Sequence, residues 1–171
     1  MLPGLALFYV GAVLILNGLW MLGRIGDREI SPINFFTGGV TLLVALKLAF
    51  GDGADAASIR AAAFSLLFSF TYLWVAINRH NGADGRGLGW FSLFVAITAV
   101  PVAIDTLAAA RSTWDVWLGI SWAAWAFLWL LFFLLLALKK PLTRFTASTA
   151  IVQGVLTGWV PGYLLLVGAI G

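Results

Sequence analysis

The chain has 171 residues, of which 62% are hydrophobic and only 10% are charged. In a soluble domain roughly half of the residues are apolar, so a fold of this size cannot bury such an excess and lipid must cover it. The absence of cysteine excludes disulfide bonds and thiolate metal sites, and the ten Lys and Arg residues are too dispersed to form a nucleic-acid-binding patch.

In chain order, six apolar segments reach the length of about 20 residues that a helix needs to cross a bilayer. They cover residues 2–22, 32–50, 60–78, 88–107, 116–138 and 147–169. The connectors between them are short and hold turn residues, so consecutive helices are expected to pack as antiparallel hairpins. The sequence therefore predicts an all-α integral membrane protein, a single transmembrane domain whose six-helix bundle is built of three helix hairpins.

The basic residues predict the orientation of these spans. Seven lie in the first, third and fifth connectors and three lie in or beside the second and fourth: Arg24, Arg28, Arg79, Arg86, Lys139, Lys140 and Arg144 against Lys47, Arg60 and Arg111. Connectors rich in Lys and Arg stay in the cytoplasm. With an even number of spans, both termini are expected on the outer side.

Uncharged polar side chains lie inside the first and last spans, at Asn17 and Gln153. An amide buried in lipid needs either a helix partner or a water-lined cavity, and the sequence leaves both alternatives open. The last span also carries three glycines four residues apart, Gly154, Gly158 and Gly162. Such a face allows close helix packing, against either the same chain or a neighbouring one.

The fifth span carries an aromatic stripe. Trp122, Trp125 and Trp129 are spaced three and four residues apart and therefore share one helix face. Lipid anchoring and simple helix packing are the alternatives to pore lining. Anchoring tryptophans collect at the membrane interfaces, and Trp125 and Trp129 are too deep for that role.

Groups that perform catalysis are missing from the sequence. It has no hydrolase, nucleotide-binding or metal-binding motif, and His80, the single histidine, falls in a polar connector. No acidic residue lies deep within a span, because Asp105 and Asp115 are near helix ends. Ion-coupled transporters usually keep an ionisable group at membrane depth. We therefore expect no enzyme, cofactor or metal, and we favour a passive route for neutral solutes.

Several blocks in the correct order resemble a known family, the urea and short-chain amide channels of the UreI/AmiS type. They are LALFYVGAVLILNGL, INFFTGG, FTYLWVAIN, WFSLFVAIT, WAAWAFLW and PLTRFTASTAIVQGVLTGWVPGYLL, and together they extend over nearly the entire chain. The resemblance implies a passive channel for urea or short aliphatic amides in the bacterial inner membrane. It also implies a homohexamer with a pore within each protomer, and a functional link to a cytoplasmic amidase or urease.

The resemblance also implies positions for the pore. The family's constriction falls here on Val10, Leu14, Asn17, Phe70, Trp74, Trp122, Trp125, Leu128 and Trp129. The family's pore glutamate corresponds to Gln153, which keeps hydrogen-bonding capacity but removes the charge. Acid-gated relatives carry histidines in long outer loops, whereas the outer connectors here are short and contain none, so we expect an ungated channel. A secondary active transporter and a non-transporting membrane scaffold are the alternatives.

Overall fold

The computed structural model describes residues 1–170, which form helices and no strand. Six helical stretches in this range are long and apolar enough to cross a membrane, which confirms the predicted fold class. The first four are α1 (Leu2–Met21), α2 (Ser31–Phe50), α3 (Ala56–Asn81) and α4 (Arg86–Ala108). The fifth joins α5 (Thr113–Phe132) to a π-helical turn, η1 (Phe133–Ala137), and the sixth joins α6 (Thr143–Gln153), the π-helical η2 (Gly154–Trp159) and α7 (Val160–Leu166).

Local chemistry sets several helix ends. Asp55 accepts a hydrogen bond from the backbone N–H of Ser58 and so caps the start of α3, and Ser112 caps α5 in the same way. The turn between α3 and α4 needs positive φ at Gly82 and Gly85, where φ is 72° and 79°. Glycine adopts this conformation without steric cost, so the two helices can reverse direction over a few residues.

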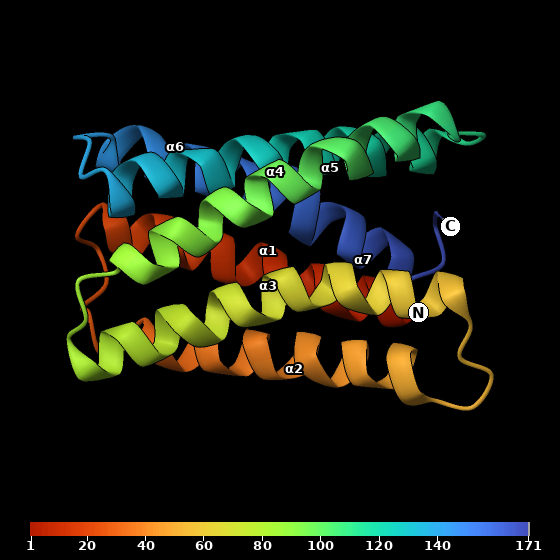
Figure 1. The fold of residues 1–171 in the computed structure, drawn as a ribbon, viewed down its shortest axis with the longest axis horizontal. Helices are drawn as coiled ribbons and strands as arrows, with labels where there is room; N and C mark the ends of the chain where they lie inside the picture. The colour runs from red at the N-terminus through yellow and green to blue at the C-terminus, as the bar shows by residue number, and fades with distance from the viewer. Residues whose placement is uncertain (171) are drawn as a thin grey trace.

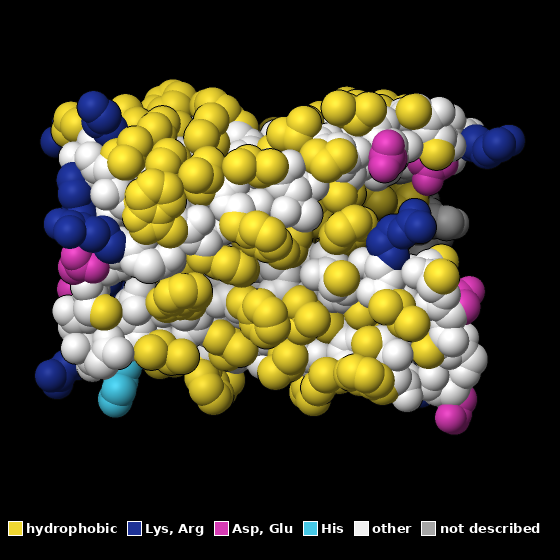
Figure 2. All heavy atoms as spheres, viewed as in Figure 1, with side chains coloured by type: hydrophobic (Ala, Val, Ile, Leu, Met, Phe, Trp, Pro, Cys, Tyr) yellow, Lys and Arg dark blue, Asp and Glu magenta, His cyan; other side chains and the backbone are white. Residues whose placement is uncertain are grey.

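The helices lie side by side along the long axis of the molecule (Figure 1), with both marked termini near one end. The connectors α1–α2, α3–α4 and α5–α6 lie at the opposite end, which we call the basic end because Lys and Arg side chains gather there (Figure 2). Hydrophobic side chains cover the middle of the visible face. Such an apolar surface is what a multi-pass membrane protein presents to lipid.

Three helix pairs pack most closely: α2 with α3, α4 with α5, and α1 with the last span. The third pair joins the two ends of the chain through glycine. A methyl group placed on Gly154 would lie 2.9 Å from the carbonyl oxygen of Gly11, and methyl groups on Gly158 and Gly162 would overlap the backbone of α1. The glycine face of the last span therefore contacts α1 of the same chain, which answers the question that the sequence left open.

Candidate permeation pathway

A cavity of about 390 Å³ lies inside the bundle and opens at the basic end. Its walls come from α1, α3, α4, α5 and η1, and they are mostly apolar or aromatic. The polar groups that the deeper walls contribute are few, and they belong to Asn17, Thr71, Tyr72, Asn78 and Ser92. Apolar walls with a small number of placed polar groups are typical of a site for a small molecule.

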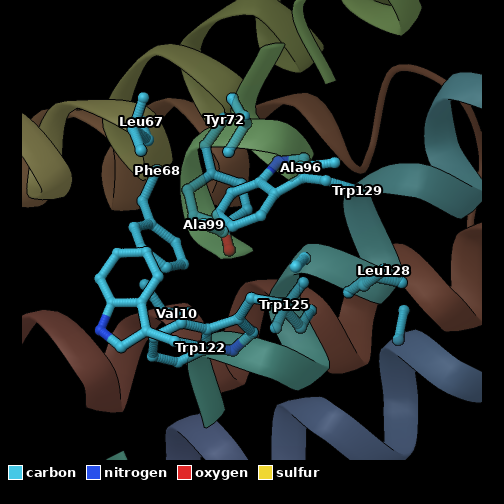
Figure 3. Packing of buried hydrophobic residues seen from close by; sticks show 14 of the residues in the cluster. Val10, Leu67, Phe68, Tyr72, Ala96, Ala99, Trp122, Trp125, Leu128 and Trp129 are labelled. Atoms are coloured by element: carbon cyan, nitrogen blue, oxygen red, sulfur yellow. The ribbon is translucent and has the colours of Figure 1, made fainter. Parts of the chain in front are cut away.

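Aromatic rings close the cavity on the side that faces the termini. Phe68 of α3 packs edge-on against three indoles of α5, with ring centroids 5.8 Å from Trp122, 4.9 Å from Trp125 and 4.8 Å from Trp129. Phe64 covers Trp122 from the next turn of α3, at 5.7 Å. Figure 3 shows Phe68 and the three indoles turned toward one another. We call these five rings the aromatic cluster.

Two of the indoles are anchored by threonine. The Trp125 Nε1–H donates to Thr157 Oγ1 at 2.8 Å, and the Trp129 Nε1–H donates to Thr71 Oγ1 at 3.2 Å. Buried indole N–H groups normally need such a partner. The two rings are therefore fixed by the last span and by α3, as well as by their own helix.

An amide pair lies on the α1 side of the cavity. The Asn17 side chain donates to Asn34 Oδ1 at 3.0 Å, and the Asn34 side chain donates back to Asn17 Oδ1 at 2.6 Å. Asn34, on α2, is fully buried and also donates to the Ile30 carbonyl oxygen at 2.9 Å. Asn17 lines the cavity, whereas Asn34 lies outside it and holds the Asn17 side chain in place from the α2 side. The two alternatives for Asn17, helix partner and cavity lining, both apply.

The mouth of the cavity is lined by charged and aromatic groups that sequence reasoning did not select. The Trp20 indole donates to Asp27 at 2.7 Å, the Arg79 guanidinium lies 5.2 Å from the centroid of the Trp20 ring, and Arg79 and Asp27 form an ion pair at 3.8 Å. These residues come from α1, the first connector and α3, and no short sequence pattern links them.

Five of the sequence-predicted positions line this cavity: Leu14, Asn17, Trp125, Leu128 and Trp129. Val10 and Trp122 lie in the same hydrophobic cluster, one turn closer to the termini. Phe70 and Trp74 do not reach the cavity, because they are 46% and 37% exposed on the outer surface of α3. The cavity face of α3 instead carries Phe68, Thr71, Tyr72, Val75 and Asn78, at helical spacing.

Gln153 also lies away from the cavity, in a groove between α5 and the last span. Its Nε2 donates to the carbonyl oxygen of Ala124 at 2.8 Å, directly before Trp125 in the chain. Its Oε1 is buried and has no hydrogen-bond partner among the residues that the structure describes. Gln153 is therefore placed behind the aromatic cluster, where it contacts the backbone that carries Trp125.

The candidate pathway offers nothing that resembles a metal centre. Over residues 1–170, no three His, Cys, Asp or Glu side chains come together. The charged groups that line the described cavity are Asp27 and Arg79, both at the mouth.

Comparison with known proteins adds independent findings. Residues 2–169 match the model of the AmiS/UreI family of transporters. A Mycolicibacterium smegmatis protein, named as a transporter of amidate substrates, is 47% identical over 96% of this chain and 76% of its own length. The acid-activated urea channel of Helicobacter pylori is 38% identical over 96% of this chain and 97% of its own. A crystal structure of the urea channel from Helicobacter pylori superposes with a TM-score of 0.88 at 39% identity and covers 100% of both chains.

Proposed function

Because the chain belongs to the AmiS/UreI family of transporters, we propose that it is a passive, ungated channel for urea and short-chain aliphatic amides. One observation carries the proposal: a cavity whose charged groups are confined to its mouth ends on a cluster of aromatic rings. The names of the relatives, a urea channel and an amidate transporter, supply the substrate class.

The physical chemistry of the aromatic cluster suits a small, planar, neutral solute. Ring faces and edges can contact a flat amide on both sides, whereas an ion would lose hydration that these apolar walls do not replace. Asn17 offers the donors and acceptors that complement an amide as it enters or leaves the cluster. The pathway is therefore selective against ions without a charged filter.

A channel accounts for these observations better than a secondary active transporter. Coupling to protons or sodium ions would need an ionisable or cation-coordinating group at depth, and the described cavity has its carboxylate, Asp27, at the mouth. A scaffold without transport activity would need no internal cavity that ends on a cluster of aromatic rings. The similarity to urea channel structures favours the channel as well.

The proposed pore residues follow from the sequence prediction as adjusted by the cavity. Val10, Leu14, Asn17, Trp122, Trp125, Leu128 and Trp129 are retained. Phe68 and Thr71 take the place of Phe70 and Trp74 on α3, and Gln153 is assigned to supporting Trp125. Replacement of Gln153 by Leu is still expected to lower urea flux, through displacement of the Trp125 backbone.

The surroundings of the channel are also part of the proposal. The basic end holds seven Lys and Arg residues and the other end holds three. We infer from this difference that the basic end faces the cytoplasm and both termini lie outside, in a bacterial inner membrane. Exposed aromatic and aliphatic side chains on α2 and α4, such as Phe36 at 64% and Ile97 at 65%, leave apolar surface for lipid and for copies of the chain in a homohexamer. A cytoplasmic amidase or urease would consume the permeant and keep its gradient inward.

The test is urea permeability of proteoliposomes that contain the wild-type protein, Trp125→Ala or Trp90→Ala. Trp90 is 56% exposed on the outside of α4 and serves as the matched control. We expect Trp125→Ala to change urea flux or selectivity severalfold and Trp90→Ala to leave both unchanged. Equal flux and selectivity in all three proteins, at equal protein content, would remove the aromatic cluster from the pathway.

A further inference from the structure

The two anchored indoles share an arrangement that is repeated on two different helices. Trp125 and Trp129 are one turn apart on α5, and each donates its indole N–H to a threonine on another helix. Each threonine hydroxyl in turn donates to the carbonyl oxygen four residues before it. Thr157 donates to Gln153 at 2.7 Å, and Thr71 donates to Leu67 at 2.7 Å.

This arrangement determines which way each hydroxyl points. A threonine hydroxyl has one proton and two lone pairs. Because the proton is committed to the backbone carbonyl, the oxygen can meet the indole only as an acceptor. Both indole N–H groups are therefore satisfied, and each ring is held at its nitrogen as well as through its own side-chain torsions.

The arrangement is specific to the cluster, because back-bonding alone is common in this chain. Thr98 and Thr149 also donate to the carbonyl oxygen four residues earlier, at 2.8 and 2.9 Å, yet both are only partly buried and the structure gives them no indole partner. Thr157 lies within the π-helical turn η2, and such turns recur at functional sites.

We propose that Thr71 and Thr157 are positioning residues that determine the selectivity of the aromatic cluster. They engage the N–H groups of Trp129 and Trp125 in hydrogen bonds, so these two indoles present carbon faces and edges to the solute and offer it no free donor. An amide can then pass without a strong hydrogen bond between its carbonyl and the wall. Conduction requires this, since a solute that binds too well leaves slowly. The proposal rests on the proposed channel function.

The consequence of removing one hydroxyl is defined by the geometry. Thr157→Val keeps the shape of the side chain but leaves the Trp125 N–H buried without a partner, a costly state that the indole can relieve by rotating toward the solute. We expect urea permeability to fall about fivefold, the factor that corresponds to one lost hydrogen bond of ordinary strength. Discrimination between urea and acetamide should change as well.

The experiment compares Thr157→Val, Thr157→Ser and the control Thr98→Val in proteoliposomes, with permeability to urea, acetamide and water. In parallel, ultraviolet resonance Raman spectra of the same proteins report the hydrogen-bond state of indole N–H groups. The proposal predicts a weakened hydrogen bond from the Trp125 N–H and altered selectivity in Thr157→Val, recovery of both in Thr157→Ser, and wild-type behaviour in Thr98→Val.

Three results would overturn the proposal: wild-type permeability ratios in Thr157→Val despite a freed indole N–H, no recovery in Thr157→Ser, or an unchanged Raman signature in Thr157→Val. If Thr157→Val does not yield folded protein, Thr71→Val and Thr71→Ser decide by the same criteria through Trp129. If the wild-type protein passes no amide, the proposed function fails, and the Raman signature alone decides whether these threonines hold the indoles.

Discussion

The amide pair gives a quantitative prediction. Asn34 is fully buried, exchanges two hydrogen bonds with Asn17 at 3.0 and 2.6 Å, and donates a third to Ile30. Asn34→Leu keeps the number and branching of the side-chain heavy atoms and leaves the Asn17 amide without both of its hydrogen bonds to Asn34. Hydrogen bonds between membrane helices contribute about 0.6 kcal/mol on average and up to about 1.7 kcal/mol each. Two reciprocal bonds should therefore couple the residues by about 1–3 kcal/mol.

A double-mutant cycle measures this coupling. The free energy of unfolding of the wild type, Asn17→Leu, Asn34→Leu and the double variant is determined by denaturant titration in mixed micelles. Each single variant should be destabilised, and the double variant should be destabilised by less than the sum. Thr41→Val is the matched control, because Thr41 is equally buried on α2 but bonds only within its own helix.

Additive effects of Asn17→Leu and Asn34→Leu, within about 0.5 kcal/mol, would refute the reasoning, since independent sites behave in that way. A coupling between Asn17→Leu and the Thr41→Val control as large as that of the pair would refute it too. Flux gives a second readout: Asn17→Leu should lower urea permeability more than Asn34→Leu, because the cavity loses the Asn17 amide only in the first.

Three further predictions concern packing, pH and the outer surface. Gly11→Ala should cost about 1–3 kcal/mol of unfolding free energy in thermal or denaturant unfolding, because the new methyl group overlaps the backbone of Trp159, whereas Gly39→Ala meets no atom within 4 Å and should not destabilise. Backbone N–H donors lower the pKa of the Asp55 and Asp84 carboxyls, so any stability that these charges contribute persists on acidification until the pH falls through the lowered pKa. Urea flux measured from about pH 5 to about pH 8 should therefore be flat. A steep change of flux in this range would contradict ungated conduction. Phe70→Ala should leave urea permeability unchanged in the proteoliposome assay, and a large loss would return Phe70 to the pathway.

Much of the fold could be predicted because composition and charge placement constrain it strongly. Apolar length gives the six spans, and the glycine spacing of the last span marks a helix that packs closely. The inner face of the fifth span could be predicted for a further reason. Tryptophans at positions 122, 125 and 129 repeat at helical spacing and at a depth where lipid anchoring does not explain them.

The face of α3 that lines the cavity was harder to predict from the sequence, for a physical reason. A soluble helix has one polar face, but a membrane helix is apolar toward lipid and toward its neighbours, so periodicity cannot separate its faces. Phe68 and Phe70 are therefore equivalent by hydrophobicity, although one lies in the aromatic cluster and the other is 46% exposed. The small polar residue on the buried side, Thr71, marks the inner face, and its hydrogen bond to Trp129 spans 58 positions in the chain.

The geometry of the last span and of the cavity mouth could not be predicted from a sequence pattern. A π-helical turn from Gly154 to Trp159 shifts the helical register of the residues that follow Gln153, and no residue type predicts such a turn. The contacts among Trp20, Asp27 and Arg79 depend on how the first connector folds over the end of α3. Both features arise from tertiary packing.

A passive route for small neutral amides can be measured as the permeability of proteoliposomes that contain the wild-type protein. Urea and acetamide are supplied as outward or inward gradients, with and without a protonophore and an imposed membrane potential, and sodium and chloride fluxes are recorded on the same vesicles. A passive amide channel should show rapid amide movement down its gradient in either direction, indifferent to protonophore and potential, and no ion flux. Amide uptake that collapses with the protonophore while its own gradient persists, or an ion flux carried by the protein, would contradict it.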